Sequence, residues 1–280
     1  STVHQHDAPI IDTCAESILN QYGITGFICD NEFYKDVCKR VADKAAESIL
    51  SAVPLTRIGF GKAVVKDIAS NRRIPGKGKK LKGVRFSAMP PDSWMVNEPD
   101  GLIDPYLKQI SFMSDDRIIA AFSCYATHPM SYYRTGKCSA DIVGEARHIV
   151  ESEESSTLQI YSNGCGGDIG PGKYNDGTEQ SRISMSMRLA EAMKQALTSA
   201  ECFSLKEAEI KHSTLDFAKR LTPRFTKEKL EKKLSLLLKN RTPVSREFME
   251  SLFSTNFKRF IDIWNTATGL SWLYNLEENG

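Results

Sequence analysis

The strongest constraint on the fold is a predicted β-hairpin near the middle of the chain. Residues 107–112 and 117–126 have the composition of two strands, and residues 114–116 supply the turn between them. The second strand contains an uninterrupted apolar run, residues 118–122, which is typical of a central strand buried on both faces. With the helices predicted around it, this hairpin predicts an α/β fold in which helices flank a mixed β-sheet.

Periodicity and composition predict further elements along the chain. Helices are predicted at residues 31–52, 141–150, 180–197, 227–239 and 244–260. Strands are predicted at residues 58–68, 158–162 and 210–217, with a strand end at residues 1–9 and long Gly-containing loops at residues 70–105 and 163–177. We expect one core over residues 1–220 and a helical segment over residues 221–280, whose packing the sequence does not specify.

Composition narrows the classes of partner. The 37 basic and 35 acidic residues give a net charge of +2, so there is no reason to expect nucleic acid. No run of about 18 apolar residues occurs, so we expect no transmembrane segment. No signal peptide is expected at the start. The seven cysteines lack zinc-ribbon spacing and are expected to be mostly buried thiols. Oligomeric state and redox compartment are not specified.

Three of the five histidines lie at predicted strand ends. On a strand, His4 and His6 would point to the same face. They could share one ion, one could bind it while the other holds the substrate, or they could form a hydrogen-bonded surface pair. His128 closes the predicted buried strand, where ligands collect in α/β sheets. Together the three predict a metal site in loops at strand ends, and zinc is the natural ion for imidazole ligands.

A glycine-rich segment, residues 163–172, is the next candidate. Backbone N–H groups of Gly166 and Gly167 could stabilise an oxyanion, and Asp168 could orient a water molecule or a ligand. The alternative is a tight turn in which Asp168 binds its own backbone. Asp141, before a predicted helix, is expected to be an N-cap or a partner of a metal-bound histidine.

Basic residues crowd the stretch from residue 72 to residue 85. Such a run is typical of a solvated loop. The alternative is a loop that contacts an anionic headgroup.

Taken in order, these segments resemble a known family. The matching motifs are His4-x-His6 with Pro9, Asn71-Arg72, Ala126-Thr127-His128-Pro129, Ser139-Ala140-Asp141-x-x-Gly144 and Gly166-Gly167-Asp168-x-x-Pro171. Their order and spacing over about residues 1–200 resemble the neutral/alkaline (non-lysosomal) ceramidase family and its bacterial relatives.

The resemblance implies zinc-dependent hydrolysis of the amide bond in N-acylsphingosine, and so a role in sphingolipid metabolism. By resemblance, His4 and His128 match zinc ligands, and His6 matches a histidine beside the metal and its water. Arg72 matches an arginine that lines the site, and Asp168 matches an aspartate that supports the nucleophile. Family members are often exported, which implies a periplasmic or secreted location.

The sequence departs from the family at three points. Gly170 stands where the ceramidases carry a catalytic serine, so either a metal-activated water acts directly or ceramide is not the substrate. Asp7 stands where the family often has serine, and its carboxylate could reach the metal. The family completes its metal site with a later glutamate and tyrosine, which find no match before Gly280. We therefore expect an inner portion of a longer protein.

These observations predict a zinc-dependent hydrolase of the N-acyl amide bond in a small or lipid-like substrate. His4, His6 and His128 are the expected metal ligands, with Asp7 and Asp141 behind them. The expected catalytic residues are His6, Arg72 and Asp168, and the oxyanion and substrate are expected to meet Gly166, Gly167 and Gly170. The alternatives are a metal hydrolase of a different ester or amide, and a non-catalytic binding relative.

Overall fold

The computed structural model describes residues 4, 6–78, 80–133, 135, 137–153, 157–206, 211–215, 225–239, 251 and 255–278. The chain forms two compact units, one of residues 1–8 and 53–210 and the other of residues 9–52 and 211–280. This division differs from the expected one because residues 9–52 belong to the second unit.

A five-stranded mixed sheet forms the centre of the first unit. Its strands are β1 (Arg57–Val64), β5 (Tyr106–Ser114), β6 (Arg117–Tyr125), β7 (Leu158–Asn163) and β9 (Glu201–Ser204). The strand order is β7-β6-β5-β1-β9, with β6 and β7 parallel and the other pairs antiparallel. The predicted α/β fold, a mixed sheet flanked by helices, is confirmed.

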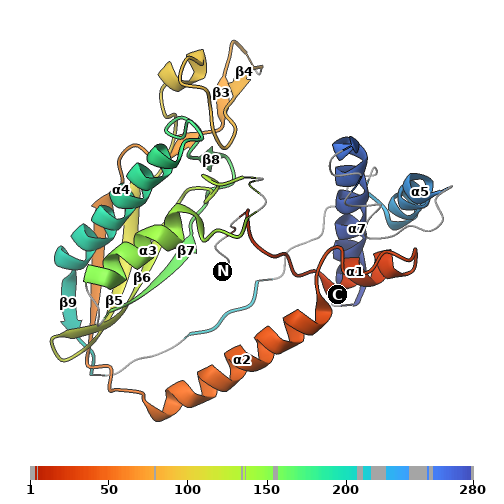
Figure 1. Ribbon diagram of the computed structural model, residues 1–280. Helices are drawn as coiled ribbons and strands as arrows, with labels where there is room; N and C mark the ends of the chain where they lie inside the picture. Colours follow the sequence, from red (N-terminus) through yellow and green to blue (C-terminus); the bar gives the residue numbers. More distant parts are fainter. Residues whose placement is uncertain are drawn as a thin grey trace. The chain divides into compact units, whose positions relative to one another are not determined.

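Two helices, α3 (Asp141–Glu153) and α4 (Glu179–Thr198), pack on one face of this sheet (Figure 1). Leu107, Ile142, Met185 and Leu189 lie in the core between these layers. Helix α4 approaches β1 so closely that a Cβ on Gly61 would lie 1.9 Å from a backbone oxygen of α4. Only glycine fits at that point of β1.

The predicted hairpin is confirmed as β5 and β6, and β6 lies inside the sheet between β5 and β7. The expectation that its apolar run is buried on both faces is wrong for the described residues. Ala121 is fully buried, whereas Ile118, Ile119, Ala120 and Phe122 keep intermediate exposure. Among the described residues, α3 and α4 cover only the face on which Ala121 lies.

Four short strands interrupt the segments that were expected to be loops. Strand β2 (Ser70–Asn71) pairs with β8 (Ile169–Gly170), and β3 (Arg73–Pro75) pairs with β4 (Leu81–Val84). A 3-10 turn, η1 (Trp94–Asn97), follows. Strands of two to four residues are too short to show an alternating pattern, so the sequence did not predict them.

The second unit is helical. It contains α1 (Thr13–Asn20), α2 (Asn31–Leu50), α5 (Lys227–Leu238) and α7 (Phe257–Glu278). Its core is formed by α1, α5 and α7 with the loop after α1, through Leu19, Ile24, Leu234 and Ile263. The Glu16 carboxylate accepts hydrogen bonds from four backbone N–H groups of that loop, at residues 26–29.

The remaining predictions are met in part. Six predicted elements are confirmed with small shifts of their ends: the helices at residues 31–52, 141–150, 180–197 and 227–239 and the strands at residues 58–68 and 158–162. Strand β9 and helix α1 were not predicted. Residues 211–215 have no regular structure, and the rest of the strand expected at 210–217 lies outside the described residues. Much of the helix expected at 244–260 also lies outside them, while α7 runs beyond its expected end. No helix in the described part of the chain is long and apolar enough to cross a membrane.

Candidate metal centre

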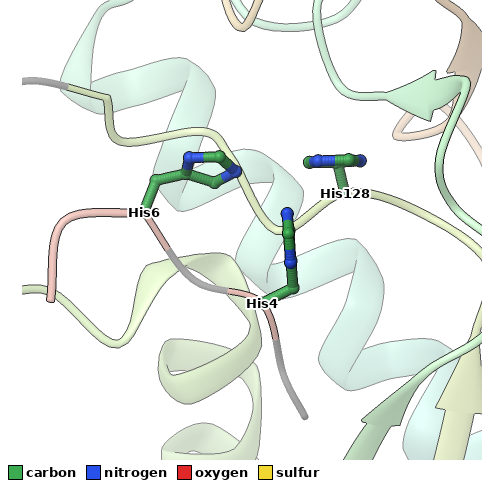
Figure 2. A group of neighbouring side chains, drawn as sticks. All are labelled: His4, His6 and His128. Atoms are coloured by element: carbon green, nitrogen blue, oxygen red, sulfur yellow. The ribbon is translucent and has the colours of Figure 1, made fainter. Parts of the chain in front are cut away.

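Three imidazole rings converge at one end of the sheet (Figure 2). His128 follows the end of β6, and His4 and His6 come from the N-terminal segment. One ring nitrogen from each lies within 4.8 Å of the other two, and the ring centroids are 4.7 Å apart for His4–His128, 5.2 Å for His4–His6 and 5.5 Å for His6–His128. Three imidazoles at this separation can hold one transition-metal ion.

The N-terminal histidines do not lie on a strand, contrary to prediction. His4 has a left-handed backbone with φ of 48°, and residues 6–8 form a bend. Both rings reach His128 through this turn rather than through the two-residue repeat of a strand. A non-glycine residue at positive φ is strained, so the surrounding contacts must hold the turn.

Asp7 anchors this turn to a neighbouring loop. Its carboxylate accepts hydrogen bonds from the Thr135 N–H at 2.8 Å and from the Thr135 hydroxyl. Its backbone oxygen accepts from the Ser139 N–H at 2.7 Å. The structure therefore places Asp7 as a support for the segment that carries His4 and His6.

The glycine-rich loop fixes the orientation of His128. The His128 N–H donates to the Ile169 oxygen at 2.9 Å, and ring nitrogen Nδ1 lies 2.9 Å from the Gly166 oxygen. Because a carbonyl only accepts, Nδ1 carries a proton, and in the neutral tautomer that this bond selects the Nε2 lone pair is free. A Cβ on Gly166 would lie 2.8 Å from the Thr127 carbonyl carbon, so the loop needs glycine there to come this close.

Desolvation favours the neutral form of the His4 and His6 rings. The pKa of His6 is lowered first by burial and then by the neighbouring His4 and His128 rings, with an opposing effect of Asp141. The pKa of His4 is lowered by burial and by His128. In the described part of the chain, Nε2 of His6 is buried and has no hydrogen-bond partner. Neutral imidazoles with available lone pairs are the form that binds a metal.

A pocket of about 330 Å³ opens beside His4 and His128. Its other lining residues are Thr127, Asn163, Gly164, Gly166 and Gly167. The Gly166 N–H already donates to the Gly164 oxygen at 2.8 Å, whereas the Gly167 N–H donates to no described atom. Of the two expected oxyanion donors, Gly167 is the one with an available hydrogen.

Sequence reasoning missed two residues at this centre. The buried Thr127 hydroxyl has no hydrogen-bond partner among the described residues, and the Tyr133 ring packs edge-on against His6 with centroids 5.5 Å apart. Both residues lie close to His128 along the chain, and Thr127 also belongs to the motif Ala126-Thr127-His128-Pro129.

Gly170 and Arg72 lie beside the same histidines but do not line this pocket. A Cβ on Gly170 would lie 3.7 Å from the Arg72 Cγ and 3.8 Å from the His128 Cβ, which is ordinary contact distance. The position has room for a side chain that would face both residues. Arg72 is half-buried and also acts electrostatically on His6.

Asp168 and Asp141 make contacts that the sequence did not predict. The Asp168 carboxylate lies 3.4 Å from an Arg73 guanidinium nitrogen, and its backbone oxygen accepts from the Arg72 N–H at 2.7 Å. Asp141 is buried and accepts hydrogen bonds from the Ser131 N–H and hydroxyl, the Tyr132 N–H and the Ile142 N–H. Asp141 therefore ties the loop after His128 to α3, rather than only capping the helix.

The basic stretch 72–85 is not simply a solvated loop. Arg85 is 1% exposed, and its guanidinium donates to the backbone oxygens of Asn71, Met95, Glu98 and Pro99 at 2.8–3.0 Å. A buried arginine with four carbonyl partners therefore joins residue 71 to residues 95–99 within the segment 70–105.

Fold and site together define an α/β protein with a candidate three-histidine metal centre. No protein-family model and no curated protein matches the sequence. Among solved structures, the chain is similar to a neutral ceramidase from Pseudomonas aeruginosa, with 16% identity and a TM-score of 0.37. It is also similar to a structure described as ceramidase complexed with C2, with 15% identity and a TM-score of 0.38. Each match covers 51% of this chain and 22% of the other, so this chain spans only part of their length.

Proposed function

We propose that this protein is a zinc-dependent hydrolase of an N-acyl amide bond. The observation that carries the proposal is the convergence of His4, His6 and His128, whose ring nitrogens lie within 4.8 Å of one another. When bound there, zinc would supply a Lewis acid for the substrate carbonyl and lower the pKa of a water molecule. The lowered pKa values of His4 and His6 and the hydrogen bond that orients the His128 ring fit such an ion.

The surrounding residues have separate roles in this proposal. The free Gly167 N–H would donate to the oxyanion that develops on the substrate carbonyl. The Asp168 carboxylate, held by Arg73, would accept a proton from the attacking water. Arg72 would orient the polar part of the substrate. Asp7 and Asp141 would hold the two segments that carry the histidines.

Zinc binding is the first test. We expect about one zinc per chain by mass spectrometry, and more than about a hundredfold weaker binding in His128→Ala, because even a lost ligand support costs up to about that much. His148→Ala is the matched control, since His148 is exposed on α3, away from the three converging rings. Absence of zinc after zinc is supplied, or an unchanged affinity in His128→Ala, would contradict the proposed centre.

The reaction is tested by a substrate panel with zinc added and removed. N-acyl amides and matched esters of the same acyl chain are compared by the release of amine or alcohol. Zinc-dependent release of amine supports the amidase proposal, whereas esterolysis alone would favour a metal hydrolase of a different substrate. Zinc binding without turnover of either would favour a non-catalytic binding relative. Both alternatives are tested because Gly170 stands where the resembled family has its catalytic serine, and glycine cannot supply that hydroxyl.

A further inference from the structure

Among the described residues, Arg72 is a cation without a counter-ion in the site. Its Nε is buried and has no hydrogen-bond partner, and no described carboxylate lies within ion-pair distance of its guanidinium. Two carboxylates of the candidate site have other partners: Asp168 contacts Arg73, and Asp141 binds the loop at residues 131–132. The adjacent imidazoles carry no negative charge in either protonation state and cannot balance the charge.

The backbone around Arg72 is held on all sides. The Asn71 N–H donates to the Asp100 oxygen at 2.7 Å, and the Arg72 N–H donates to the Asp168 oxygen at 2.7 Å. Arg85 binds the two carbonyls, through its guanidinium to the Asn71 oxygen and through its N–H to the Arg72 oxygen. Arg85 is thus a positioning residue for the Arg72 backbone, which needs no further ordering when a ligand meets the side chain.

A half-buried guanidinium without a partner is costly, and an anionic ligand group would remove that cost. Carboxylate and phosphate match its planar fork with two parallel hydrogen bonds. A hydroxyl group offers neither the charge nor two acceptor oxygens. The surroundings of Arg72 therefore favour a charged group over a neutral alcohol.

We propose that the ligand of this site carries a carboxylate or phosphate group, which Arg72 binds beside the three histidines. The substrate is then an anionic N-acyl compound, such as an N-acyl amino acid, rather than a neutral N-acyl amino alcohol. This substrate class rests on the proposed hydrolase function, whereas the binding of the anion by Arg72 does not.

Two short ligands with one acyl chain test the proposal. Binding of N-hexanoylglycine and N-hexanoylethanolamine to the full chain is measured by titration calorimetry, with and without zinc. We expect the glycine compound to bind about tenfold to a hundredfold more tightly, the usual range for a charged hydrogen-bonded pair. Arg72→Met should remove the preference and Arg72→Lys should keep part of it. Arg188→Met, which replaces an exposed arginine on α4, should keep all of it.

Hexanoate, the acid that hydrolysis of either ligand would release, is the third arm. Equal affinity for the two N-acyl ligands, or a preference that survives in Arg72→Met, would overturn the proposal. If hexanoate is the one ligand of the three whose binding depends on Arg72, then Arg72 binds the product and the proposal is also overturned. Circular dichroism checks that each variant is folded, and Arg72→Lys carries the test if Arg72→Met is not. If the protein binds no zinc when zinc is supplied and still shows the Arg72-dependent preference, the zinc hydrolase is refuted and the anion site stands.

Discussion

Replacing Arg85 with leucine removes a buried guanidinium that makes four hydrogen bonds to backbone carbonyls. At a net contribution of about 1 kcal/mol for each bond, the loss is about 4 kcal/mol. Leucine fills much of the volume but leaves the carbonyls without a donor, so apolar burial offsets little of this. Burial lowers the pKa of Arg85, yet a guanidinium stays protonated, and the net value for each bond already includes the cost of desolvating it. We expect a net destabilisation of about 3–5 kcal/mol.

Hydrogen exchange of the Asn71 and Arg72 amides measures this loss locally, because both N–H groups are hydrogen-bonded in the loop that Arg85 holds. A loss of about 4 kcal/mol accelerates their exchange about a thousandfold. Arg147→Leu is the control: its Nε makes one backbone hydrogen bond, to the Gln159 oxygen at 2.7 Å, so about 1 kcal/mol is expected. Exchange of Asn71 and Arg72 that is less than tenfold faster in Arg85→Leu would refute the assignment of Arg85 as the residue that holds this loop.

Two further predictions concern pH and packing. Since the folded state lowers the pKa of His4 and His6, the unfolded chain takes up protons first, and the metal-free protein should lose stability as the pH falls below about 6.5. A thermal melt at pH 5–8 should show a smaller pH effect in the His4→Gln/His6→Gln double variant, and an equal effect in both proteins would argue against the lowered pKa values of these two rings. Gly61→Ala should cost about 1–3 kcal/mol or more in urea unfolding because its methyl group would lie 1.9 Å from the backbone of α4. Gly170→Ala should change stability by less than about 1 kcal/mol, since its methyl group would meet nothing closer than 3.7 Å; similar losses in both would contradict the close approach of α4 to β1.

Local patterns in the sequence determined most of the regular structure. The β5–β6 hairpin and helices α2, α3, α4 and α5 each repeat apolar residues over enough positions to be recognised without their partners. Strands β2, β3, β8 and β9 have two to four residues, and their pairing depends on segments distant in the sequence. The grouping of residues 9–52 with residues 211–280 is equally non-local.

The candidate site also has features that the local sequence predicted and features that depend on distant segments. The sequence singled out His4, His6 and His128 because imidazoles are scarce in this chain and stand at predicted strand ends. It could not show that a left-handed turn at His4, and not a strand, brings the rings together, because that turn is held by contacts between distant loops.

Only the tertiary structure decided what the polar residues around the histidines do. Arg72 and Arg85 have the same side chain in the same basic stretch, yet the Arg72 Nε lacks a partner among the described residues and Arg85 binds four carbonyls. Gly166 and Gly167 are adjacent, yet of the two only Gly167 keeps an N–H that donates to no described atom. Hydrogen bonding and burial are properties of the folded surroundings, which residue type and spacing along the chain do not encode locally.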